Sequence, residues 1–428
     1  MKKLHEHAAG IDLGSRKIYI GLEGKEVVSF ETFTSDFLKA SDYLKHNNVT
    51  TVAMEATGVY WIILYDILIA SGFDTWLVDG RQTKQVPGRK TDVKDCQWIQ
   101  QLHSYGLLNK CFVADGALKV LRSYQRIRED HIRSSAMHIQ HMQKALIEMN
   151  IRLPEVLSQI HGKSGMAIIE AILKGERDSK KLLSLCDSRL KKNKSEQILK
   201  ALEGFYTPQG LFAMKQAYLA YNFYQQQIVE CDNEIAKILV QLNPIDSSGK
   251  PLTRKPVRHH GPNIKNFGNH MLHLFDGKDA TKLSGITDYS WFQLYTEVGS
   301  DLTKWPTEKH FTSWLALSPG QNHSGKKKKN ARKGHPKAGQ IFRQIAQSLL
   351  NSKHIALGGF GRRIRARKGP GIAVKAVARK LAIQYWRLMV KGSDYVEKGV
   401  EHYEQMLLLQ KQKALKRLAN ELKIEIVI

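Results

Sequence analysis

With 428 residues, the chain has room for roughly two or three domains, and its 66 Lys and Arg residues against 40 Asp and Glu residues give a formal net charge of +26. Such a charge indicates a polyanionic partner, and the four scattered cysteines, none of them in a C-x-x-C pair, argue against a disulfide framework and a zinc site. Because neither a run of 18 apolar residues nor a signal-peptide-like start occurs, we expect a cytoplasmic protein without a membrane partner.

The first part of the chain, residues 1–115, alternates β-like apolar runs with helical segments. Two paired strands are expected over residues 10–22 and 26–30, joined around Gly24. The elements expected after them are a helix over 37–46, a strand over 50–55, a helix over 60–71, a strand over 74–78 and a helix from 92 to about 105. This order predicts an α/β domain with a mixed sheet.

Four acidic residues lie at the ends or starts of these elements: Asp12, Glu55, Asp92 and Asp95. Asp12 and Glu55 each end an apolar run, and Asp92 and Asp95 share one helix face because they are three residues apart. Carboxylates that converge from two strands and one helix form an oxygen cage suited to Mg²⁺, with Mn²⁺ as an alternative ion. The pattern is typical of an RNase H/RuvC-like nuclease core, in which two ions about 4 Å apart clamp a phosphodiester. Taken singly, Asp12 could be a turn residue and Asp92 a helix cap.

Residues 116–243 are predicted to be helical. Ile132, Ile139 and Leu146 repeat every seven residues, and a later helix over 211–242 has a 3-4 alternation that Gln225 and Asp232 interrupt. These seams predict a coiled coil, either packed within one chain as a helical hairpin or formed across a dimer. Residues 162–200 read as a small helical region between the two helices. The polar, basic stretch 244–280 is predicted to be a linker or insertion.

The last part, residues 281–428, is predicted to be a helical domain with helices over 338–348 and 374–389. Within residues 321–380 the sequence has 17 Lys or Arg and no Asp or Glu, which indicates phosphate binding. The candidate nucleic-acid-binding residues in this stretch are Lys326, Lys327, Lys328, Lys329, Arg332, Lys333, Lys337, Arg343, Arg362, Arg363, Arg365 and Arg367.

One serine, Ser324, precedes this basic run between His323 and Gly325. It is either an ordinary turn hydroxyl or a nucleophile whose alkoxide the positive field of the lysines makes less costly. Glycine at 325 allows close backbone approach to a phosphate.

Several motifs together resemble one known family. In the amino-terminal part they are GIDLGS at 10–15, MEATGVY at 54–60 and RKTDVKD at 89–95, and in the carboxy-terminal part FTSWLALSP at 311–319, SGK at 324–326 and AVARKLA at 376–382. This set resembles the DEDD transposases of bacterial insertion sequences, in the insertion-sequence one-ten family, over nearly the whole chain.

The resemblance implies a RuvC-like domain, a helical coiled-coil region and a transposase domain, which we place over 1–115, 116–243 and 281–428, with the linker or insertion over 244–280 between the last two. It implies that Asp12, Glu55, Asp92 and Asp95 bind metal and that Ser324 forms a phosphoserine link to DNA. The partners it implies are donor and target DNA, a structured guide (bridge) RNA and further copies of the chain, from dimer to tetramer, near the bacterial nucleoid.

Three other functions stay open on the residues. A RuvC-like junction nuclease would hydrolyse DNA without needing Ser324, and a site-specific invertase would recombine fixed sites without RNA. A non-catalytic nucleic-acid-binding protein would account for the charge alone. Metal-dependent strand transfer, dependence on Ser324 and an RNA requirement distinguish them from an RNA-guided transposase.

Overall fold

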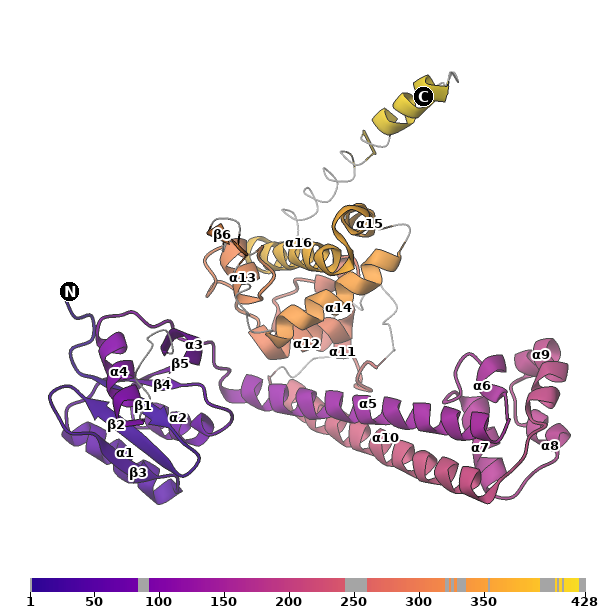
Figure 1. Cartoon of the computed structure of the whole chain (residues 1–428), viewed down its shortest axis with the longest axis horizontal. Helices are drawn as coiled ribbons and strands as arrows, with labels where there is room; N and C mark the ends of the chain where they lie inside the picture. Colours follow the sequence, from indigo (N-terminus) through magenta and orange to yellow (C-terminus); the bar gives the residue numbers. More distant parts are fainter. Residues whose placement is uncertain are drawn as a thin grey trace. The chain divides into compact units, whose positions relative to one another are not determined.

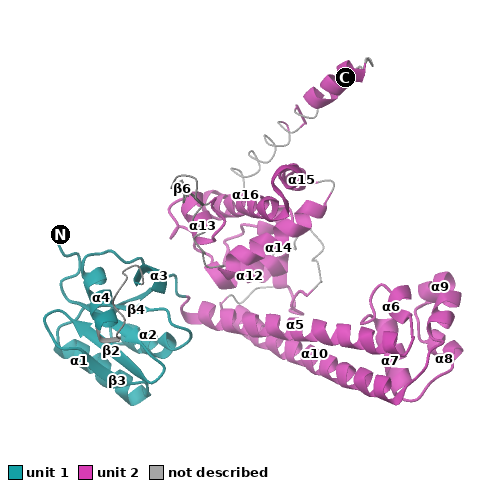
Figure 2. Cartoon of the chain, in the orientation of Figure 1, with its two compact units in different colours: residues 1–113 teal, residues 114–428 magenta. Residues whose placement is uncertain are grey.

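The computed structural model describes residues 2–83, 92–242, 260–319, 323–324, 327–328, 336–352, 355–392, 405, 408–409 and 412–422. The chain divides into two compact units, residues 1–113 and 114–428, which are described one at a time below (Figure 2). The predicted class, a small mixed-sheet α/β domain followed by helices, is confirmed (Figure 1). The predicted domain boundaries stay a prediction.

Unit 1 is built on a five-stranded mixed sheet. Its strands are β1 (Ala8–Leu13), β2 (Lys17–Leu22), β3 (Val28–Glu31), β4 (Thr51–Glu55) and β5 (Asp74–Val78), in the order β3-β2-β1-β4-β5. The pairs β1–β2 and β2–β3 are antiparallel, and β1–β4 and β4–β5 are parallel. The single strand predicted over 10–22 is instead a hairpin, because the chain turns back after Leu13 and the amide of Gly14 donates to the carbonyl of Lys17 at 2.9 Å.

Helices cover both faces of this sheet. The helices of unit 1 are α1 (Thr34–His46), α2 (Trp61–Ala70), α3 (Gly80–Thr83) and α4 (Asp92–Ser104). Ile11 and Met54 belong to a core that includes Phe37 of α1 and Leu64 of α2. Ala53, which points the other way, packs with residues of α4. The period-two alternation of the strands therefore separates an α1/α2 face from an α4 face.

Unit 2 begins with two long helices, α5 (Gly116–Glu148) and α10 (Pro208–Leu242), which run side by side as an antiparallel hairpin (Figure 1). The helical hairpin, one of the two arrangements left open by the sequence, is therefore present within the chain. α5 ends at Glu148, and Asn150, two residues later, has a left-handed φ of 54°.

The two polar interruptions of the α10 seam have partners on α5. Gln225 donates to the hydroxyl of Ser135 at 2.7 Å. Asp232 accepts from Arg128 Nε at 2.6 Å, and both side chains are almost fully buried. Arg128 also donates to the carbonyl of His260 at 2.8 Å, so the buried charges are well satisfied.

At the far end of the hairpin, where α5 ends and α10 begins, four shorter helices share one core. They are α6 (Leu153–Val156), α7 (Lys163–Leu173), α8 (Ser179–Ser184) and α9 (Ser188–Ala201). Ile168 and Ile198 from this group are buried with Met142 of α5 and Met214 of α10. The small helical region predicted between the long helices is confirmed.

The other end of the hairpin packs against a helical bundle. Its elements are α11 (Phe267–Leu274), the 3-10 helix η1 (Ala280–Lys282), α12 (Asp288–Val298), α13 (Glu308–Trp314), α14 (Lys337–Asn351), α15 (Ala356–Lys368) and α16 (Pro370–Lys391). Leu121 and Leu239 of the hairpin are buried in the same core as Phe342 and Tyr385. α11 lies within the stretch that was predicted to be a linker. The segment forms a helix there, and its Met271 is buried in this core. None of the described helices is long and apolar enough to cross a membrane.

Candidate active site

Two predicted ligands, Asp12 and Glu55, lie at neighbouring strand ends. β1 and β4 are parallel with Ile11 opposite Met54, so Asp12 and Glu55 come next on adjacent strands. Because Ile11 and Met54 belong to the α1/α2 core, the alternation of side chains directs Asp12 and Glu55 to the α4 face. Both residues are half-buried. The sheet thus brings two carboxylates to one edge of one face.

The helix α4 crosses this face at backbone-to-backbone distance, which only glycine permits. A Cβ on Gly10 would lie 2.2 Å from the amide N of Gln100 and 2.3 Å from the carbonyl O of Cys96. A Cβ on Gly21, which pairs with Gly10 across the hairpin, would lie 2.8 Å from the amide N of Gln97. These two glycines form a flat seat for α4 on β1 and β2.

The third predicted ligand, Asp95, lies on α4 next to Cys96, whose carbonyl O lies against Gly10 of β1. Burial, assisted by the carboxylates of Asp12 and Asp95, raises the pKa of the Cys96 thiol to about 12. Both carboxylates therefore act on the same sulfur atom. Cys96 stays a protonated thiol at neutral pH, so it is not a nucleophile in this site.

Glu55 is held by contacts that the sequence did not reveal. The hydroxyl of Thr83 donates to Glu55 Oε2 at 2.8 Å, and the carbonyl of Thr83 accepts from the indole of Trp98 at 3.1 Å. Gly80 lies against the same carboxylate, since a Cβ there would be 2.2 Å from Glu55 Oε1. Thr83 and Gly80 fix the orientation of the Glu55 carboxylate, whereas β4 fixes the position of its backbone.

The fourth predicted ligand, Asp92, starts α4, but its side chain lies outside the described residues. Among the described side chains, no three of His, Cys, Asp and Glu are close enough to hold a metal ion. The donor chemistry nevertheless fits a hard cation, because Asp12, Glu55 and Asp95 offer carboxylate oxygen ligands from one sheet edge and the helix over it.

The predicted nucleophile lies in unit 2, in a segment between α13 and α14 that we name the serine segment (residues 317–336). Within it, β6 (His323–Ser324) pairs with β7 (Lys327–Lys328) in antiparallel register, with Ser324 opposite Lys327. The side chains of these four residues lie outside the described part, as do Lys326, Lys329, Arg332 and Lys333.

The remaining predicted nucleic-acid-binding residues differ in their surroundings. Lys337 Nζ lies 2.7 Å from Glu129 Oε2, and Arg343 donates to the carbonyl of Ala316 at 3.1 Å. Arg362 donates to the carbonyls of Leu350 and Ser352 at the end of α14. The exposed cations of the set are on α15, namely Arg363, Arg365 and Arg367.

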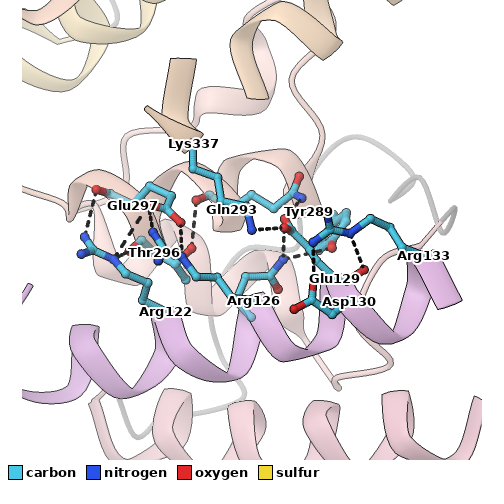
Figure 3. Close-up of polar contacts among 11 residues, drawn as sticks. Arg122, Arg126, Glu129, Asp130, Arg133, Tyr289, Gln293, Thr296, Glu297 and Lys337 are labelled. Carbon is cyan, nitrogen blue, oxygen red and sulfur yellow. Dashed lines mark hydrogen bonds and ion pairs between the residues drawn. The ribbon is translucent and has the colours of Figure 1, made fainter. Parts of the chain in front are cut away.

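A polar network joins the hairpin helix α5 to α12 (Figure 3). Arg126 makes a two-point contact with the carboxylate of Glu297, at 2.9 and 2.8 Å. Arg122 donates to the carbonyls of Thr296 and Glu297 at 2.8 and 3.0 Å. Arg122, Arg126 and Glu129 share one face of α5 by their spacing, but solvated helix faces show the same pattern, so the sequence did not identify this interface.

Two family models match the chain, one for each end. A DEDD transposase model of the IS110 family, described as Transposase, matches residues 9–151, and a model described as Transposase IS116/IS110/IS902 family matches residues 279–357. No curated protein matches. The first match covers the strands and helix that carry Asp12, Glu55 and Asp95, and the second covers the serine segment. The chain therefore belongs to the IS110 family of DEDD transposases and is a DNA transposase.

Proposed function

We propose that this transposase cuts and rejoins DNA strands by transesterification, with Ser324 as the nucleophile and Asp12, Glu55, Asp92 and Asp95 as ligands of Mg²⁺. The observation that carries the proposal is that β1 and β4 place Asp12 and Glu55 at neighbouring strand ends, on the face that is crossed by α4, the helix of Asp95. When bound there, Mg²⁺ would supply a Lewis acid for the phosphate oxygens.

The residues around the acids have separate tasks in this proposal. Glu55 is oriented by the hydroxyl of Thr83, which donates to its Oε2 at 2.8 Å. The seat formed by Gly10 and Gly21 keeps α4, and with it Asp95, close to the strand that carries Asp12. A group held in this way loses little freedom when it binds a cation.

In the strand-transfer step, Ser324 Oγ forms a bond to phosphorus while the bond from phosphorus to a deoxyribose oxygen breaks. The proton of the serine leaves with a base, for which His323 is a candidate, and the released deoxyribose oxygen takes up a proton. Attack by a hydroxyl of another strand reverses these bonds and frees the serine. Lys326–Lys329 and Arg332 neutralise the charge on the phosphate.

We also propose that the protein is guided by a structured RNA and acts as an oligomer of two to four copies of this chain. The formal net charge of +26 supports a polyanionic partner beyond a short DNA site. Sequencing the RNA that copurifies with the protein tests the guide. A defined structured transcript is expected, whereas recombination at full rate after removal of all RNA would favour an invertase that acts at fixed sites.

Removal of divalent cations tests the metal part of the proposal. Chelation with EDTA should abolish strand transfer between donor and target DNA, and Mg²⁺ or Mn²⁺ should restore it, because the carboxylates alone repel the phosphate. Binding of DNA, measured by fluorescence anisotropy in the same buffers, serves as the control and should persist in EDTA. Undiminished recombinant product in EDTA would contradict a metal site.

The exposed arginines of α15 should bind phosphates. Changing Arg363, Arg365 and Arg367 together to Ala should weaken binding to all DNA sequences alike and flatten the plot of log affinity against log salt by about 0.9 per lost contact. Lys200→Ala is a matched control, since Lys200 is exposed on α9 and lies 3.1 Å from Glu196. An unchanged slope in the triple variant would show that these arginines only face solvent.

A further inference from the structure

The two ends of the serine segment are both held by α14. At the first end, α13 closes in a turn in which the amide of Leu317 donates to the carbonyl of Thr312 at 2.9 Å and that of Ala316 to the carbonyl of Ser313 at 3.0 Å. Ala316 has a φ of 54°, a left-handed conformation that is unfavourable for a non-glycine residue. A contact from outside the turn adds to its stability.

That contact comes from the first turns of α14. Gly339 lies against the end of α13, because a Cβ there would be 2.2 Å from the carbonyl O of Leu315. Arg343, one turn further along the same face, donates to the carbonyl of Ala316 at 3.1 Å. The residue that leads into the serine segment is thus fixed by an arginine of the helix that follows the segment.

At the second end, Lys337 is the first residue of α14 and is paired with Glu129 of α5 at 2.7 Å (Figure 3). The side chains of Lys337 and Glu129 are only 29% and 17% exposed. Glu129 also accepts from Gln293 at 2.6 Å and from Gln125 at 3.2 Å. A cation at a helix start is disfavoured by the helix dipole, and the carboxylate of Glu129 offsets this. The anion that Lys337 binds is therefore a side chain of the protein.

We propose that Lys337 and Arg343 are positioning residues for the serine segment, acting through Glu129 and the Ala316 carbonyl, and are not contacts to DNA phosphates. The proposal rests on the proposed nucleophilic role of Ser324. Because both anchors belong to one rigid helix, they fix the two points between which β6 and β7 must form. A displacement of Ser324 by about 1 Å would slow its attack on phosphorus without weakening DNA binding.

The test separates the rate of covalent adduct formation from the affinity for DNA. Lys337→Gln and Arg343→Gln should each slow adduct formation at saturating DNA by roughly ten- to a hundredfold, while the dissociation constant and its salt dependence stay those of the parent protein. Lys309→Gln, at an exposed lysine of α13, is the matched control and should change neither quantity.

A charge exchange gives the second arm. Lys337→Glu should be slow, and the double variant Glu129→Lys, Lys337→Glu should recover the parent rate to within about threefold, because the pair is re-formed with opposite signs. If the exchanged pair does not fold, as judged by thermal melting, the neutral pair Glu129→Gln, Lys337→Gln replaces it and should be no slower than Lys337→Gln alone.

Two results would overturn the positioning role. One is a Lys337→Gln protein with weaker DNA binding and a salt slope flatter by about one unit, which identifies a phosphate contact. The other is a rate of adduct formation equal to that of the parent protein in both Lys337→Gln and Arg343→Gln. Failure of the proposed nucleophile is a distinct result, since it shows as product formation in Ser324→Ala whatever happens at Lys337.

Discussion

Asp12→Asn should lower strand transfer by on the order of a hundred- to a thousandfold while unit 1 keeps its fold. The amide has the same shape as the carboxylate and retains an oxygen that can accept from the amide of Leu13, which lies 3.0 Å from Asp12 Oδ1. What is lost is the negative charge that, in the proposed site, holds a hard cation together with Glu55 and Asp95. Removal of one group that stabilises charge in a transition state has effects of this size.

The measurement is single-turnover strand transfer on a donor and target pair, with thermal melting and DNA affinity as checks on folding and binding. Asp42→Asn is the matched control, because Asp42 is an exposed acid on α1 of the same unit. Asp92→Asn and Asp95→Asn should behave like Asp12→Asn. Normal strand transfer by the Asp12 and Asp92 variants would rule out the metal site.

Ser324→Ala should bind DNA normally and form neither a covalent protein–DNA complex nor a recombinant product. Hydrolysis would transfer the phosphate to water and leave free strand ends, whereas a phosphoserine ester keeps the phosphate available for rejoining. Loss of the serine hydroxyl should therefore remove the whole reaction. Parent affinity is expected because the side chain removed carries no charge.

A suicide DNA substrate, in which the strand beyond the cleavage site is lost, traps the adduct for mapping by mass spectrometry. The adduct should map to Ser324, and Ser318→Ala, a second serine of the same segment, should leave its yield unchanged. An adduct on Ser318 or Tyr289 would move the nucleophile elsewhere. Product without any adduct would instead favour direct transfer by the acidic site.

The sequence predicted the elements that repeat a simple period and failed where packing overrides local preference. The sheet, its flanking helices and the two long seams follow from alternation and heptads. α15 was not predicted, because its glycines disfavour a helix. In the structure these glycines allow α15 to pack closely against α14. A Cβ on Gly358 would lie 2.3 Å from the carbonyl O of Leu349, and a Cβ on Gly361 would lie 2.3 Å from Leu350 Cδ2.

The candidate site shows the same division. Asp12, Glu55 and Asp95 could be selected because each carboxylate stands at the end of a β-like run or the start of a helix. Thr83 could not be selected, since its contact with Glu55 joins residues that are distant in the sequence. Lys337 and Arg343 were predicted to bind nucleic acid on charge alone. Charge does not tell whether the group that such a residue contacts belongs to a partner or to the protein itself, as Glu129 does for Lys337 and the Ala316 carbonyl for Arg343.

The two polar pairs of the hairpin fix the register in which α5 and α10 pack against each other. Arg128–Asp232 and Ser135–Gln225 are separated by seven residues on both helices, and apolar residues lie on either side of them. Sliding one helix by a heptad, about 10 Å, would set Arg128 against Leu239 and leave a buried charge unpaired. We therefore expect insertions or deletions in the hairpin to be tolerated when both helices change by the same multiple of seven on the side away from the bundle, so that the length of the hairpin would change in discrete steps.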